Sequence, residues 1–279
     1  MFQYAAGFVL ARQSGQVHCL DVSDFEDYQL HQGFELNKVF AITSNLADAN
    51  QVRDMLGWRA GKLAKRVFHR PAFQSLWGRA LVVEPHFNYW AGLSNIGAER
   101  YISGYWQSER YFLCAQQSIR TEFTFKKPLL GVNAQMAKAM SDTASVSVHV
   151  RRGDYLSNSK NHGLMHVAEP AYYQSAISYI GRLVKNPEFY VFSDDMAWAK
   201  ANISFDYPCT YISHNNAADS YIDMQLMSSC RHHIIANSSF SWWGAWLNPS
   251  TEKIVLAPKL WFRNDTPDQD LLPEQWIRL

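Results

Sequence analysis

The sequence predicts an α/β protein whose C-terminal half carries a parallel sheet covered by helices on both faces. Two observations support this fold class. From about residue 128 onward, short apolar segments typical of strands alternate with segments whose apolar residues recur at helical spacing. Polar clusters also follow several of the expected strands, where loops leave a parallel sheet and where ligands bind in α/β folds.

The composition indicates a globular protein with no strong overall charge. A chain of 279 residues, 47% of them hydrophobic, can form one large or two ordinary α/β domains. Because the formal net charge is only +1, we expect no nucleic-acid partner, and any bound anion needs a local site. We see no apolar run of the roughly 20 residues that span a bilayer, and no signal peptide, so we expect a cytoplasmic protein without a transmembrane segment.

The cysteines give no sign of a metal site or a disulfide framework. Cys19, Cys114, Cys209 and Cys230 lie far apart and include no C-x-x-C spacing. We therefore expect reduced cysteines and no metal.

The first half of the chain begins with a predicted helix over residues 1–14, which ends at Gly15, and a strand over residues 17–22. From residue 25 to about residue 125 the periodicity of the apolar residues is weaker. Two aromatic-rich segments, residues 84–90 and 104–112, have the composition of a carbohydrate acceptor site, but loops packed on a core have it too.

The second half contains the regular alternation. Lys126-Lys127-Pro128 suggests a boundary. We therefore expect an N-terminal domain over 1–127, a C-terminal domain over 128–260 and a tail over 261–279 that packs back on the N-terminal domain. The predicted strands are 146–151, 189–193, 210–213, 233–236 and 254–257, and the predicted helices are 171–184, 196–201, 220–230 and 239–247.

The first polar cluster follows the strand that ends at Arg151. Arg151 and Arg152 are followed by Gly153 and Asp154. A guanidinium group suits a phosphate or a carboxylate bidentately, so two of them at a strand end favour an anionic ligand. An arginine–aspartate pair that only fixes a loop would give the same pattern, and Asp154 fits that role better than catalysis.

The second cluster is Asp194-Asp195, at the end of the next predicted strand. One carboxylate could hold Mg²⁺ against a diphosphate, or it could accept both donors on one edge of a guanine base. Because two arginines are nearby to neutralise a diphosphate, we favour guanine recognition by one aspartate and capping of the next helix by the other.

The third cluster, Asn237-Ser238-Ser239, precedes a predicted helix. A hydroxyl cap and the free backbone N–H groups of a helix start can bind an anion, although a plain capping motif would look the same. Trp242, Trp243 and Trp246 within this helix are expected to pack in the core.

These motifs together resemble a known family. The sequences at residues 149–154, 192–195 and 237–246, the opening Met-Phe-Gln-Tyr-Ala-Ala-Gly and the Pro-Lys-x-Trp sequence at 258–261 are similar to those of the alpha-1,2-fucosyltransferases of glycosyltransferase family eleven. The resemblance covers most of the chain.

The resemblance implies a GT-B-like fold, with two Rossmann-like domains whose parallel sheets face a cleft. It implies GDP-fucose as donor substrate, no cofactor and no metal, and inverting transfer to the 2-hydroxyl of a terminal galactose-like unit. The acceptor would be a galactose-terminated oligosaccharide of polysaccharide biosynthesis, conceivably lipid-linked at the inner membrane face. Arg151 and Arg152 match the catalytic arginines on the diphosphate, and the donor-binding positions are His149, Asp154, Asp194, Asp195, Asn237, Ser238 and Ser239.

One departure from the family concerns the start of the chain. In the family, a first strand and a Gly-Gly-Leu-Gly-Asn-Gln loop come before the sequence that here opens at Met1, so we expect both to be missing from this chain. The alternatives are therefore a non-catalytic remnant that binds a GDP-sugar or a glycan, and a transferase that uses another GDP-sugar.

Overall fold

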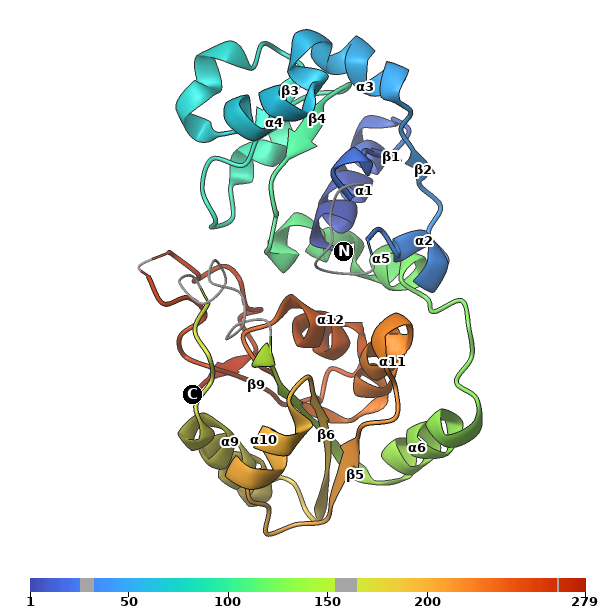
Figure 1. The fold of residues 1–279 in the computed structure, drawn as a ribbon, viewed down its shortest axis with the longest axis vertical. Coiled ribbons are helices and arrows are strands. Elements are labelled where there is room, and N and C mark those ends of the chain that lie inside the picture. Colours follow the sequence, from blue (N-terminus) through green and yellow to red (C-terminus); the bar gives the residue numbers. More distant parts are fainter. Residues whose placement is uncertain (26–32, 154–164, 265) are drawn as a thin grey trace. The chain divides into compact units, whose positions relative to one another are not determined.

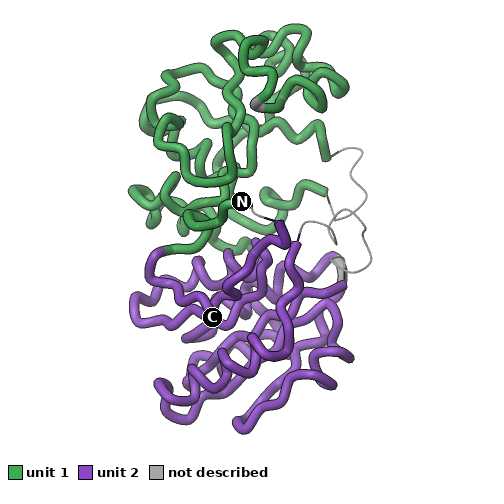
Figure 2. The backbone as a smooth tube through the Cα atoms, turned by 90° about the vertical axis from the view of Figure 1, so that its left-hand side faces the viewer, with its two compact units in different colours: residues 1–126, 267–273 green, residues 127–266, 274–279 purple. Residues whose placement is uncertain are grey.

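The computed structural model describes residues 1–25, 33–153, 165–264 and 266–279. The chain divides into two compact units (Figure 2). The first comprises Met1–Lys126 and Pro267–Pro273, and the second comprises Lys127–Thr266 and Glu274–Leu279. The tail therefore supplies seven residues to the first unit before its last six join the second.

The second unit is built on a six-stranded parallel sheet with the order β10-β9-β8-β5-β6-β7 (Figure 1). β5 lies inside the sheet, between β8 and β6, and Val150 at its end pairs in register with Ser193 at the end of β6. The strands are β5 Ala144–Val150, β6 Pro187–Ser193, β7 Cys209–Ile212, β8 His232–Ile234, β9 Val255–Ala257 and β10 Ile277–Arg278.

Helices cover both faces of this sheet. Val191 of β6 packs in one core cluster with Ile177, and Phe192 packs in another with Leu226. Successive strand residues point to opposite faces, so the two clusters lie on opposite sides of the sheet. The helices are α6 Gly131–Asp142, α9 Pro170–Leu183, α10 Met196–Asn202, α11 Ser220–Ser229 and α12 Ser239–Leu247.

The predicted α/β fold with a parallel sheet is confirmed, and each predicted strand and helix of the second half is present within a few residues. α6 and β10 were not predicted. α6 carries exposed Val132 and follows exposed Leu130, so its apolar pattern is weak. β10 is two residues long and forms only because it pairs with β9. The three tryptophans of α12 are buried, as predicted.

The first unit contains two separate two-stranded parallel sheets, β1 with β2 and β3 with β4, instead of one continuous Rossmann-like sheet among the described residues. The predicted strand over 17–22 is reduced to β1. The elements are α1 Phe2–Ser14, β1 Cys19–Leu20, α2 Leu36–Val39, β2 Asn45–Leu46, α3 Ala49–Leu56, α4 Lys62–Phe68, β3 Leu81–Val83, β4 Tyr101–Ser103 and α5 Gln116–Glu122.

Helix α1 forms the centre of the first unit. It ends at Gly15, whose left-handed φ of 66° suits glycine, as predicted. Nearly every residue of its first half is buried, so the helix is surrounded by protein and is not merely amphipathic. The Tyr4 hydroxyl and the backbone N–H of Thr43 both donate to the buried carboxylate of Glu122. That carboxylate therefore joins α1 and α5 to the segment before β2.

A buried ion pair joins β1 to α4. The ammonium group of Lys65 contacts the Asp21 carboxylate, and both side chains are less than 10% exposed. Tyr101 of β4 and the backbone of Ser23 also donate to Asp21. Burial alone would raise the pKa of Asp21, but these hydrogen bonds lower it to about 2. The pair thus stabilises the fold fully above the ordinary carboxyl pKa of 3.8, and this is lost as the pH falls toward 2.

We expect Lys65→Met to destabilise the protein by about 3 to 5 kcal/mol at neutral pH, since it leaves the Asp21 carboxylate buried without its cation. Urea unfolding, followed by circular dichroism, measures this loss. The matched control is Arg66→Met, which changes an exposed basic side chain of the same helix, with an expected change within about 0.5 kcal/mol. Equal effects of the two substitutions would show that the ion pair contributes nothing beyond the lysine stem.

Among the residues that the structure describes, no helix is long and apolar enough to cross a membrane.

Candidate functional site

The ends of β5 and β6 bring the first two predicted clusters together. The two strands are parallel and end in register, so Arg151 after β5 emerges beside Asp194 after β6. The Asp194 carboxylate accepts hydrogen bonds from the backbone N–H groups of Arg152, at 2.9 Å, and Gly153, at 3.0 Å. Its Oδ2 also lies 3.3 Å from Nε of Arg151. One carboxylate thus shapes the loop and orients the first arginine.

Gly153 suits this arrangement because it has no side chain. A Cβ atom at this position would lie 3.0 Å from Oδ2 of Asp194, at the limit of what a real Cβ contact shows. A larger residue would push the carboxylate away from the backbone N–H groups that it accepts from.

Arg152 is oriented by a different pair of partners. Its guanidinium group lies over the ring of Trp198 in α10, 3.8 Å from the ring centroid, which is a close cation–π contact. Its Nε lies 3.8 Å from Oδ2 of Asp195. The other Asp195 oxygen caps α10 by accepting from the backbone N–H of Trp198 at 3.1 Å. The predicted cap by one of the two aspartates is therefore confirmed.

His149 lies one residue inside the end of β5 and is buried. Its ring packs against Phe240 of α12, and its backbone carbonyl accepts from the Tyr173 hydroxyl at 3.2 Å. Burial, assisted by the charge of Arg151, lowers the pKa of His149 to about 3, so the ring is neutral at physiological pH. Among the described residues its buried Nδ1 has no hydrogen-bond partner, and the neutral ring can serve a ligand as a donor or an acceptor.

The third cluster lies at the start of α12, which follows β8. Ser238 caps the helix, its hydroxyl accepting from the backbone N–H of Phe240 at 3.3 Å, and Ser239 is exposed at the first helical position. Asn237 is fully buried, and its amide donates to the carbonyls of His166 and Trp261. Asn237 therefore holds the loop in place, while the exposed helix start is available to an anion.

The described site combines positive and negative groups in equal number. Arg151 and Arg152 lie against Asp194 and Asp195, so the formal charges of the four cancel. An anion would gain from guanidinium groups whose positions are already set, and it would not have to order flexible side chains. Within the described ranges, no group of three or more His, Cys, Asp or Glu side chains could hold a metal ion.

The predicted site residues fall into three groups. Arg151, Arg152, Asp194 and Asp195 form one contact network, whereas His149 and Asn237 lie beneath the surface. Ser238 and Ser239 start the neighbouring helix. Asp154 lies outside the described residues. No sequence signal pointed to Trp198 or Tyr173, because their roles depend on which strand ends become neighbours.

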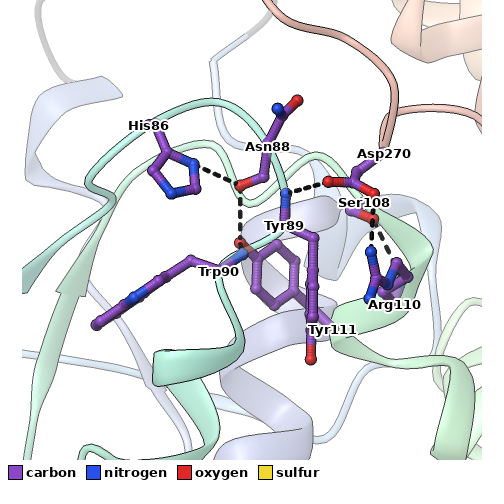
Figure 3. Close-up of polar contacts among 8 residues, drawn as sticks. All are labelled: His86, Asn88, Tyr89, Trp90, Ser108, Arg110, Tyr111 and Asp270. Carbon is purple, nitrogen blue, oxygen red and sulfur yellow. Dashed lines mark hydrogen bonds and ion pairs between the residues drawn. The ribbon is translucent and has the colours of Figure 1, made fainter.

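A second polar and aromatic network lies in the first unit, in the two segments with acceptor-like composition (Figure 3). The carboxylate of Asp270 accepts from the backbone N–H of Tyr89 at 3.1 Å and pairs with Arg110 at 2.8 Å. The Arg110 guanidinium lies 4.1 Å from the centroid of the Tyr89 ring. The Tyr111 hydroxyl accepts from the backbone N–H of Trp90 at 2.8 Å. The loop over residues 86–90 is thus fixed by contacts from two other parts of the chain, residues 110–111 and Asp270.

The second of these segments contains an uncommon backbone conformation. Trp106 has φ of 55°, a left-handed value that bulky residues rarely adopt. The carboxylate of Glu84 accepts from the backbone N–H groups of Tyr105 and Trp106, at 2.8 and 3.0 Å. Burial raises the pKa of Glu84. This carboxylate holds a strained turn that leaves Tyr105 exposed.

We expect Asp194→Asn to lower the affinity for GDP, the ligand suggested by the sequence, about tenfold in calorimetric titration. The two backbone N–H groups donate to different carboxylate oxygens, and in asparagine one of these oxygens becomes an NH2 group, which donates; the amide also no longer balances the charge of Arg151. Asp206→Asn, an exposed change with the same loss of charge, is the control and should bind as the wild type does. Unchanged GDP affinity in Asp194→Asn would contradict the role given to this carboxylate.

Comparison with known proteins gives relatives along the whole chain. A protein of Escherichia coli named alpha-1,2-colitosyltransferase is 35% identical over 291 residues, covering 100% of this chain and 94% of that protein. The O-antigen biosynthesis glycosyltransferase WbnK of Escherichia coli is 32% identical over 301 residues, covering 100% of this chain and 96% of that protein. Galactoside alpha-(1,2)-fucosyltransferase 1 of Rattus norvegicus is 30% identical over 155 residues, covering 52% of this chain and 41% of that protein.

The family model described as Glycosyl transferase family 11 matches residues 87–279. This match includes the loop of residues 151–153 after β5, here called the arginine loop, together with Asp194-Asp195 and the start of α12. It also includes the Tyr89 and Tyr111 segments of the first unit. Together with the two relatives that align along the entire chain, it shows that the protein is a glycosyltransferase and belongs to glycosyltransferase family 11.

Proposed function

We propose that the protein transfers L-fucose from GDP-fucose to the 2-hydroxyl of a terminal galactose-like unit, with inversion at the transferred sugar's anomeric carbon. The observation that carries this proposal is the arginine loop after β5, fixed by Asp194 and Trp198. Relatives named for alpha-1,2 transfer, one of them a galactoside fucosyltransferase, support the linkage and the kind of acceptor.

The proposed reaction is a direct displacement. The acceptor 2-hydroxyl oxygen attacks the anomeric carbon, the bond from that carbon to the diphosphate oxygen breaks, and GDP leaves with the bonding electrons. The acceptor hydroxyl loses its proton in the same reaction, so the products are the glycoside, GDP and one proton. Negative charge therefore builds on the diphosphate in the transition state. Arg151 and Arg152 would stabilise this charge more than they stabilise the bound donor, which is the condition for faster turnover.

We assign the remaining donor contacts by chemistry. Ser239 and the backbone N–H groups at the start of α12 would bind phosphate oxygens. His149 is neutral and next to the arginine loop, and it would contact the guanine base of the donor. An oxygen of Asp194 or Asp195 that the guanine can reach would accept hydrogen bonds from it. Since the two aspartates already support arginines and a helix cap, we propose that neutralisation of the diphosphate comes from the arginines and requires no metal.

A second donor is favoured by a specific observation. The relative at 35% identity over the full chain is named a colitosyltransferase, and not a fucosyltransferase. The arginine loop would bind the diphosphate, which all GDP-sugars share, so it would not distinguish fucose from another sugar. Transfer of another sugar from its GDP form by the same site is therefore the alternative.

We propose that the acceptor is an oligosaccharide ending in a galactose-like unit and belonging to a surface polysaccharide under assembly. The O-antigen biosynthesis relative, aligned along the whole chain, supports this choice. Such an acceptor would be lipid-linked and presented at the inner membrane face.

The test is a transfer assay with GDP-fucose and a β-galactoside, in the presence of a chelator. We expect a fucosylated product joined at the 2-hydroxyl, with an anomeric configuration opposite to that of the donor, as read by NMR. Loss of transfer in the chelator that returns with added Mg²⁺ would overturn the metal-independent proposal. Binding of GDP without transfer from any GDP-sugar would favour a non-catalytic binding protein.

We expect Arg151→Lys to lower kcat/KM by at least about a hundredfold, or roughly 3 kcal/mol, because one ammonium cannot replace a bidentate fork on the diphosphate. Arg182→Lys, an exposed change on α9, is the control and should leave turnover unaltered. Near-native turnover of Arg151→Lys would rule out the role assigned to this arginine.

A further inference from the structure

The first unit contains a cavity of about 290 Å³ beside β3. Trp77, Pro85 and Trp90 provide apolar walls, and the side chains of Gln74 and Arg79 lie at its polar edge. This volume lies near the lower end of the roughly 300 to 1,000 Å³ usual for small-molecule sites, so it suits a ligand of one or two rings.

Trp90 is placed against this cavity by a close approach to the backbone. A Cβ atom on Gly92 would lie between 2.3 and 2.6 Å from three atoms of the indole ring, so the ring can take its position only because residue 92 is glycine. In the close-up, the indole points away from the group formed by Tyr89, Tyr111 and Arg110 (Figure 3). Trp90 is half-buried and keeps surface available to a ligand.

The backbone that carries Trp90 is held rigidly. The backbone N–H of Trp90 donates to the Tyr111 hydroxyl, and the backbone N–H of Tyr89 donates to the Asp270 carboxylate. Tyr111 is buried and packs edge-on against Trp106 at 5.5 Å between ring centroids. A ring fixed in this way loses little further conformational freedom when a ligand stacks on it.

Trp77, another lining residue of the cavity, is also supported by hydrogen bonds around it. The indole N–H of Trp77 donates to the carbonyl of Phe68 at 2.9 Å, and Arg59 donates to the carbonyl of Leu76 at 3.0 Å. Trp77 is buried, so it forms a fixed apolar wall. The cavity thus combines flat aromatic surfaces with an amide and a guanidinium group.

We propose that this cavity is an acceptor subsite that binds a neutral pyranose ring, with the indole of Trp90 as its stacking platform. A galactose-type ring has one face formed by C–H groups and hydroxyl groups around its edge. The C–H face matches the indole, and Gln74 and Arg79 offer hydrogen bonds to the hydroxyl groups. This inference rests on the proposed function, because it places the acceptor glycan of that reaction.

The test combines transfer kinetics with ligand-observed NMR of methyl β-galactoside, which needs neither donor nor turnover. We expect Trp90→Ala to raise the acceptor KM at least about tenfold and to leave GDP affinity within about twofold. Hydrolysis of GDP-fucose without acceptor should persist. Trp90→Phe, which keeps a ring, should recover part of the affinity, and Gly92→Ala, which retains the indole but displaces it, should resemble Trp90→Ala.

The matched control is Trp58→Ala in the same unit. Trp58 is 61% exposed and does not line the cavity, so its replacement should leave acceptor KM and galactoside binding unchanged. Far-UV circular dichroism and the unfolding midpoint show whether each variant is folded. If Trp90→Ala fails to fold, Gln74→Ala and Arg79→Ala, which change exposed side chains, carry the test in its place.

The outcomes separate the subsite from the proposed function. Galactoside binding that is lost in Trp90→Ala, without any transfer from GDP-fucose, would leave the subsite standing and reject the proposed reaction. Transfer with an unchanged acceptor KM in folded Trp90→Ala and Gly92→Ala would overturn the subsite. Absence of galactoside binding to the wild type would also overturn it.

Discussion

The carboxylate of Asp194 joins the ends of two adjacent strands of the second unit, β5 and β6. It accepts from two successive backbone N–H groups of the β5 loop and pairs with Arg151, so the loop, the first arginine and the end of β6 take their positions together. This depends on the register of β5 and β6, which places Val150 opposite Ser193. A shift of one residue would move Asp194 away from the loop and turn its side chain to the other face of the sheet.

Carboxylates that accept hydrogen bonds from loop backbone N–H groups also occur in the first unit. Glu84 accepts from two backbone N–H groups of the Trp106 turn, Asp270 accepts from the N–H of Tyr89, and Glu122 accepts from the N–H of Thr43. In each case a carboxylate distant in sequence holds a loop that has little regular structure of its own. Hydrogen bonds to a charged acceptor are stronger than neutral ones, which is why one side chain can hold a loop.

The two proposed sites use this rigidity for different ligands. At the arginine loop, two guanidinium groups are balanced by two carboxylates, so the site is neutral before an anion arrives and needs little rearrangement to receive one. At Trp90 the lining of the cavity is mostly apolar and includes two indole rings, which suits an uncharged ring with an apolar face. This division agrees with the proposed reaction, whose donor carries charge and whose acceptor is a glycan.

The sequence by itself determined the alternation of strands and helices in the second half, the polar clusters at the strand ends and the family. These are local properties, since apolar periodicity, helix caps and short motifs depend only on residues close together in the sequence. It also determined that α1 ends at Gly15 and that one of the two aspartates caps α10, because both depend on backbone conformation within a few residues.

Only the tertiary structure decided which aspartate holds the arginine loop, that Asn237 faces inward and that Trp198 lies under Arg152. It also decided that β10 completes the sheet and that the first unit has paired strands in place of one sheet. Each of these depends on residues brought together from distant parts of the chain. Periodicity and motifs carry no information about such pairs, because the free energy of those contacts exists only once the strands have paired in register.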